Sequence, residues 1–85
     1  MFSSNQEFYK YIETLIAKLD TSGEAESASA LRNAMGNGST GSEVLGNILL
    51  ALKKLQASKV PRNLGMQGEI RAVTMDLGRV LRKWN

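Results

Sequence analysis

Four residues in the C-terminal part of the chain, Arg71, Met75, Arg79 and Arg82, have a spacing that suits partner binding. They recur at intervals of four, four and three residues, which in an α-helix places all of them in one stripe. Arginine binds carboxylates and phosphates through paired hydrogen bonds, and methionine packs adaptably on apolar surfaces. The stripe therefore predicts a partner-binding surface. The competing interpretation is a solvated outer face whose cations suit the negative end of the helix dipole.

A glycine-rich motif, GNGSTG at residues 36–41, has the spacing G-x-G-x-x-G. In dinucleotide-binding folds this pattern joins a strand to a helix, so that backbone amides approach a pyrophosphate. Here both flanking segments have helical periodicity, and the motif predicts a turn followed by a helix N-cap. Thr40, Gly41 and Ser42 would offer amides and hydroxyls to an anion, which the nearby carboxylate of Glu43 would oppose.

The residue types that catalysis needs are scarce. The chain has no histidine and no cysteine, so the commonest general base, the commonest metal ligand and a thiolate nucleophile are all missing. Most carboxylates fall on the polar faces of predicted helices, and none belongs to the inward-facing Glu-x-x-His pattern of a bundle metal site. We therefore expect no enzymatic activity, no cofactor, no metal ion and no small-molecule substrate.

The charge of the chain is polarised along the sequence. Residues 1–43 carry three cations and six anions, a net charge of −3, whereas residues 44–85 carry eight cations and two anions, a net charge of +6. The basic half suits an acidic partner, although packing of the two halves against each other would cancel part of the charge.

Protein binding is the leading hypothesis that these features support. The chain would act as an adaptor, a regulator or an immunity-type inhibitor, or the acidic half of one copy would meet the basic half of another in a homodimer. The alternative is nucleic-acid binding through the basic C-terminal half, with an affinity that falls steeply with salt. A helix-turn-helix is a poor match, because GNGSTG is longer than the usual turn and the next helix begins with Glu43. The last helix could lie on an anionic membrane only by leaving the core, so we expect no membrane partner.

Four amphipathic segments are predicted to position these residues, at about 4–20, 22–35, 42–55 and 66–84. Capping boxes mark the first two starts, with Ser4 paired to Glu7 and Thr21 paired to Glu24. The second segment has few bulky apolar side chains, so we expect it to be the least stable helix.

The segment 42–55 is the expected core helix, and Thr40 or Ser42 would cap it. One arc of its helical wheel holds Val44, Leu45, Ile48, Leu49, Ala51, Leu52 and Leu55. Leu50 lies on the polar side, where it is either exposed or covered by the second helix or by another subunit.

The last segment has an equally clear apolar arc, formed by Ile70, Val73, Leu77, Val80, Leu81 and Trp84. We expect Trp84 to anchor the final turn in the core. Pro61 prevents continuation of the preceding helix and should drive Val60 out of the helical region. Gly46 and Gly78 each weaken a helix interior, which predicts close approach of a neighbouring backbone.

Together these segments predict an all-α fold, a small helical bundle of three long amphipathic helices and one short helix, in a single domain over residues 1–85. The first ten residues lack the features of a signal peptide, and the longest apolar run, residues 48–52, is too short to span a bilayer, which predicts a cytoplasmic protein. Residues 31–55 resemble segments of small bacterial helical proteins that carry a Gly-Ser-Thr-Gly-Ser-Glu turn before a helix. The resemblance implies a bacterial source and no particular activity.

Overall fold

The structure, a computed structural model, describes the backbone of residues 4–84 and the side chains of residues 4–83. Within this range the chain forms five helices and no strand: α1 (Asn5–Thr21), α2 (Ala25–Gly36), α3 (Gly41–Ala57), α4 (Val60–Asn63) and α5 (Gln67–Trp84). The predicted all-α bundle is therefore confirmed. Helices α1, α3 and α5 are the three long helices, α2 is the short one, and α4 is a single additional turn.

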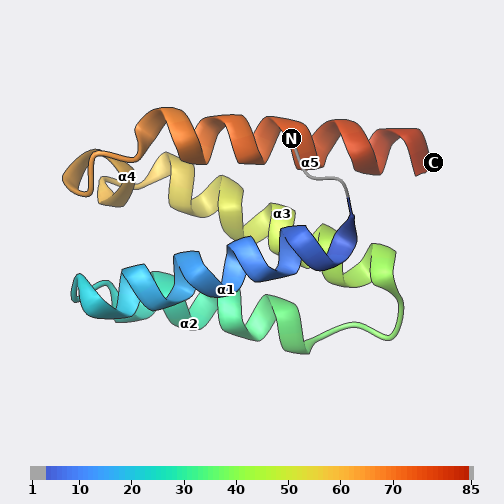
Figure 1. The fold of residues 1–85 in the computed structure, drawn as a ribbon, viewed down its shortest axis with the longest axis horizontal. Helices are drawn as coiled ribbons and strands as arrows, with labels where there is room; N and C mark the ends of the chain where they lie inside the picture. Colours follow the sequence, from blue (N-terminus) through green and yellow to red (C-terminus); the bar gives the residue numbers. More distant parts are fainter. Residues whose placement is uncertain (1–3, 85) are drawn as a thin grey trace.

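Helix α3 is the centre of the arrangement. Figure 1 shows α3 crossing behind α1, with α5 along one side of the bundle and α2 along the other. Helix α3 packs against both α2 and α5, and α1 packs against α2. The connection through α4 reverses the chain, so that α5 runs antiparallel to α3 (Figure 1). One flank of α3 is thereby placed against α5, the helix that carries the predicted binding stripe.

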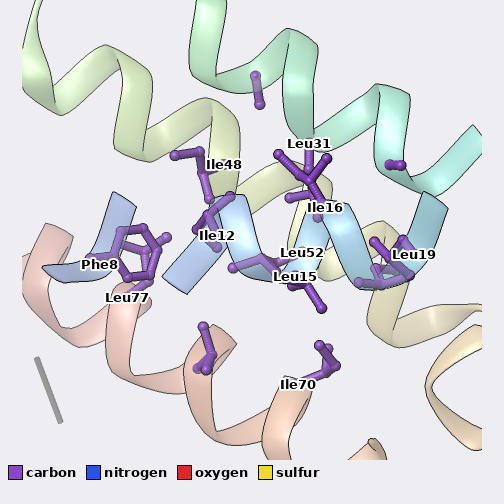
Figure 2. Packing of buried hydrophobic residues seen from close by; sticks show 14 of the residues in the cluster. Phe8, Ile12, Leu15, Ile16, Leu19, Leu31, Ile48, Leu52, Ile70 and Leu77 are labelled. Carbon is purple, nitrogen blue, oxygen red and sulfur yellow. The ribbon is translucent and has the colours of Figure 1, made fainter. Parts of the chain in front are cut away.

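The apolar faces of the helices form one core. Figure 2 shows side chains of α1 pointing toward those of α2, α3 and α5. The buried apolar residues of this core are Phe8, Ile12, Leu15, Ile16, Leu19, Ala28, Leu31, Ala34, Leu45, Ile48, Leu52, Leu55, Met66, Ile70, Val73 and Leu77. Helical periodicity therefore identified the buried sides of α3 and α5 correctly.

Val80 departs from the prediction that the whole arc of the last helix is buried. Its exposed fraction is 40%, because it lies at the edge of that arc and α5 extends beyond the first turn of α1 (Figure 1). The predicted role of Trp84 as a core anchor concerns a side chain that lies outside the described residues.

Two helix starts agree with their predicted caps. Ser4 caps α1, where its hydroxyl accepts a hydrogen bond from the backbone N–H of Glu7 at 3.2 Å. Thr40, rather than Ser42, caps α3 in the same way, and its Oγ1 lies 3.2 Å from the backbone nitrogen of Glu43. Each bond satisfies one of the N–H groups that a helix start leaves unpaired.

The predicted capping box of Thr21 and Glu24 is wrong. Thr21 is the last residue of α1, and its hydroxyl donates to the carbonyl oxygen of Ala17 at 2.8 Å. The chain turns at Gly23, whose φ of +81° is readily accessible only to glycine, and the N–H of Glu24 donates to the carbonyl of Leu19 at 2.8 Å. Residues 21–24 therefore form a glycine-based C-terminal end of α1 rather than an N-terminal cap of α2.

The connection between α3 and α5 contains the helix that the sequence does not predict. Val60 lies in α4, so the expectation that Pro61 drives it out of the helical region is wrong. Pro61 occupies the first turn of α4, where a missing backbone N–H removes no helical hydrogen bond, and its side chain is buried. Gly65, at a φ of +68°, then turns the chain toward α5.

Candidate functional site

The predicted stripe lies on the solvent-facing side of α5. Met75 has an exposed fraction of 49%, and the side chain of Arg79 one of 62%. Arg71 and Arg82 are exposed as well. Because helical spacing keeps the four residues in one row along α5, Met75 lies between the positions of Arg71 and Arg79, and Arg82 follows one turn later.

The stripe borders an open groove of about 720 Å³ between α3 and α5. Helix α3 contributes Leu49, Lys53 and Gln56, and helix α5 contributes Thr74, Met75, Gly78, Arg79, Leu81 and Arg82. Three of the four predicted binding residues thus line the groove, whereas Arg71 does not. The binding residues that α3 contributes were not predicted from the sequence. Lys53 follows Leu49 by four residues and so shares its helix face, but this spacing does not show which other helix lies beside that face.

The groove combines an apolar floor with a cationic rim. Leu49 and Leu81 are partly buried and pack against the core, and Met75 adds accessible apolar surface beside them. No acidic residue belongs to the lining as far as the structure describes it. The cations of the rim are Lys53, Arg79 and Arg82.

The two cations of α5 are held only loosely. Arg79 Nη1 lies 3.5 Å from Asp76 Oδ1, and Arg82 Nε lies 3.4 Å from the carbonyl oxygen of Gly78. Exposed ion pairs contribute about 0–1 kcal/mol, and a hydrogen bond of this length is weak. Both guanidinium groups therefore remain available to an anionic group of a partner.

Thr74 supplies the hydroxyl group of the groove lining. Thr74 is buried at its base, and its hydroxyl donates to the carbonyl oxygen of Ile70 at 2.7 Å. In the part of the chain that the structure describes, no buried side-chain nitrogen or oxygen lacks a hydrogen-bond partner. No three acidic residues gather there into a group that could hold a metal ion.

Gly46 and Gly78 contradict the prediction of close backbone contact. A Cβ atom added at either position would meet no neighbouring atom within 4 Å. Gly78 lines the groove, whereas Gly46 lies on α3 outside it. Leu50, one turn beyond Gly46, has an exposed fraction of 61%, so α2 does not cover it. Both glycines therefore face open space.

The GNGSTG loop binds a carboxylate of its own chain. Glu43 Oε2 accepts hydrogen bonds from the backbone N–H of Ser39 at 2.9 Å and from the Ser39 hydroxyl at 3.3 Å. Asn47 Nδ2 donates to the carbonyl oxygen of Asn37 at 2.9 Å and ties the loop to α3. The motif is the turn and N-cap that the sequence predicts, and Glu43 occupies the start of α3 where an anion would bind.

Two polar contacts join helices away from the groove. The hydroxyl of Tyr11 donates to Glu69 Oε2 at 2.5 Å and links α1 to α5. Arg32 Nη2 lies 2.6 Å from Asp20 Oδ2 and links α2 to α1. Burial, together with the hydrogen bond to Glu69, raises the pKa of Tyr11 above its usual range. None of the four residues lines the groove.

Comparisons with known proteins return no relative of this chain. No protein-family model, no curated protein and no solved structure matches it. Among the described residues, no helix has both the length and the apolar character that crossing a membrane requires. The groove and its chemistry are therefore the basis for a functional proposal.

Proposed function

We propose that this chain is a non-enzymatic protein-binding module that engages another protein through the groove between α3 and α5. The observation that carries the proposal is the exposed Met75 among the cations of the groove rim. Methionine and arginine are enriched in the cores of protein–protein interfaces relative to the rest of the protein surface. Such a module would act as a small adaptor, regulator or immunity-type inhibitor.

The groove suits a protein better than a nucleic acid. A nucleic-acid surface needs cations that follow the phosphates and, for single strands, aromatic side chains that stack on bases. Here the apolar floor lies between Lys53 on α3 and the two arginines on α5, and no aromatic residue belongs to the described lining. Other cations of the basic half, such as Lys54 and Arg62, are exposed outside the groove. A protein can bury the floor and pair with the rim at the same time.

Site-specific photo-crosslinking tests the proposal. p-Benzoylphenylalanine in place of Met75, in cells that produce the protein, should form a discrete adduct with another protein, because this position faces the groove. The matched control carries the same residue in place of Ala17, which is exposed on α1. A protein adduct from Met75 that is absent from Ala17 supports the proposal.

Three other outcomes overturn it. Equal adducts from both positions would reveal non-specific contact, and nuclease-sensitive material from Met75 would favour the nucleic-acid alternative. An absence of any adduct at Met75 would leave the stripe as a solvated helix face. Circular dichroism on both variants should first show the same helix content as the wild type.

A further inference from the structure

We infer that the occupant of the groove is an acidic amphipathic α-helix of another protein, an inference that rests on the proposed function. Three properties of the groove favour this occupant: its length and helical walls, the single sign of its charge, and the open backbone at Gly78.

The walls of the groove match about two turns of a helix. The lining extends from Leu49 to Gln56 on α3 and from Thr74 to Arg82 on α5. At a rise of about 1.5 Å per residue, each wall is about 10–12 Å long. Two antiparallel helices in contact leave a trough between their side chains in which a third helix packs, and no strand of the described residues offers an edge for β-addition. The partner would therefore present apolar anchors at i, i+3 or i+4, and i+7.

The charge of the rim selects an acidic partner. Lys53 stands on the α3 wall, and Arg79 and Arg82 stand one turn apart on the α5 wall. A helix whose apolar stripe is bordered by Glu or Asp on both sides would meet cations from both walls. Guanidinium groups bind such carboxylates through paired hydrogen bonds, and the weak contacts of both arginines leave them able to turn toward the partner.

Gly78 leaves space in the groove for an apolar side chain of the partner. It lies between the positions of Met75 and Arg82 on the groove side of α5, and an added Cβ atom would meet nothing within 4 Å. The missing side chain leaves the α5 backbone open to a large apolar side chain. A bulky apolar residue in place of Gly78 would fill this space without changing the charge of the rim.

A second copy of this chain is a poorer occupant. A symmetric dimer through the groove would place cations opposite cations. The acidic half, formed by α1 and α2, has no exposed large apolar side chain among the described residues, since those are Leu50, Met75 and Val80. The acidic charge and the apolar anchor must therefore come from a different protein.

An unbiased peptide selection tests the inference. A displayed library of peptides of about 16 residues, roughly four helical turns, keeps leucine at i, i+3, i+4 and i+7 and randomises the other positions. Selection on the wild-type protein, after depletion on the Gly78→Leu variant, should enrich peptides with a net negative charge. Enrichment of neutral or basic peptides, or of no peptide, would refute the inferred occupant.

Binding of an enriched peptide, measured by fluorescence anisotropy, then locates the site. Arg79→Glu/Arg82→Glu should weaken binding by more than about tenfold, because two attractions become repulsions. Lys10→Glu/Lys18→Glu makes the same change of net charge at exposed positions of α1. Screening should keep the effect of this control below about twofold at physiological salt. An equal loss from both pairs would mean that net charge alone attracts the peptide, which refutes the groove as its site.

Gly78→Leu and Gly46→Leu form a second matched pair. Both place the same side chain at a helix-interior glycine with open space around it, but only Gly78 lines the groove. Gly78→Leu should weaken peptide binding by more than about tenfold and Gly46→Leu by less than about twofold. A protein adduct at Met75 without acidic peptides in the selection refutes the acidic helix and supports the proposed function. Acidic peptides without an adduct at Met75 refute the proposed function and support the binding preference of the groove.

Discussion

Glycine-to-alanine substitutions at three positions should change the stability of this protein with opposite signs. Gly46 and Gly78 lie inside α3 and α5, and an added Cβ atom would meet nothing within 4 Å at either position. Glycine in a helix interior costs about 0.5–1 kcal/mol relative to alanine, because it loses more backbone freedom on folding. Gly46→Ala and Gly78→Ala should therefore each raise the free energy of unfolding by about that amount.

Gly38→Ala should have the opposite effect. Gly38 has a φ of +123°, which residues with a side chain rarely adopt. Its added Cβ atom would lie 3.1 Å from Glu43 Cβ, 3.1 Å from the backbone nitrogen of Val44 and 3.2 Å from Val44 Cγ2. Because that nitrogen belongs to the first turn of α3, relief of the contact would disturb the helix start. We expect a loss of more than about 1 kcal/mol.

Urea denaturation and thermal melts followed by circular dichroism measure all three effects. For a chain of this length, about 1 kcal/mol corresponds to a shift in Tm of about 4–8 °C. Gly46 and Gly78 share no neighbour within 4 Å, so the double variant should show the sum of the two gains within about 0.5 kcal/mol. A loss of stability in either helix variant would refute the open space inferred there. An unchanged Gly38→Ala variant would refute the backbone strain.

The remaining predictions concern a cap, the core, a surface position and an ionisable contact. Thr40→Ala should lower the free energy of unfolding by about 1 kcal/mol in urea denaturation, because an N–H group at the start of α3 loses its acceptor. Ile48→Ala should lower it by about 2–5 kcal/mol in the same assay, since this fully buried side chain would leave a cavity. Met75→Glu should leave it within about 0.5 kcal/mol of the wild-type value, because Met75 is exposed on the surface of α5. Tyr11→Phe should lower it by about 1 kcal/mol at neutral pH, through loss of the hydrogen bond to Glu69. Urea denaturation across a pH series should show that the difference in free energy of unfolding between wild type and Tyr11→Phe shrinks above about pH 10. The raised pKa keeps Tyr11 protonated in the folded state, whereas the tyrosine of the unfolded state ionises and stabilises that state.

Each of these predictions has a contrary result. If Thr40→Ala is as stable as the wild type, water replaces the capping hydroxyl without a loss of stability. If Ile48→Ala is as stable as the wild type, the packing around α3 is contradicted. A loss above about 1 kcal/mol in Met75→Glu would give this side chain a role in the fold. A difference in the free energy of unfolding between wild type and Tyr11→Phe that does not change with pH would contradict the raised pKa of Tyr11.

Local patterns account for the part of the fold that the sequence predicts. The buried faces follow from spacings of three and four residues, and the caps at Ser4 and Thr40 depend on residues within one turn. The failure at Thr21 has a local cause of a different kind. Two local motifs compete for the same residues, and the glycine-based turn at Gly23 leaves Thr21, the expected cap of α2, as the last residue of α1.

The groove could be predicted only on one side. Arg79 and Met75 share a helix, so their proximity follows from their spacing in the sequence. Lys53 lies beside them because α4 and Gly65 turn α5 back along α3. This geometry depends on α4, a helical turn that the sequence did not predict because Pro61 was expected to keep Val60 out of a helix. The pairing of two helix surfaces is a tertiary property, set by packing of the whole core rather than by any one segment.

The two open glycines separate what folding requires from what binding would use. Neither is needed by the fold, because each leaves space that a methyl group could occupy. Natural domains tolerate such residues, so a costly glycine indicates a function only through its location. Gly78 lies in the groove, whereas Gly46 lies outside it, one turn before the exposed Leu50. Alanine at both positions should raise stability to a similar extent, and only Gly78→Ala should weaken binding of a selected acidic peptide. A loss of binding from Gly46→Ala would instead extend the binding surface across α3 toward Leu50.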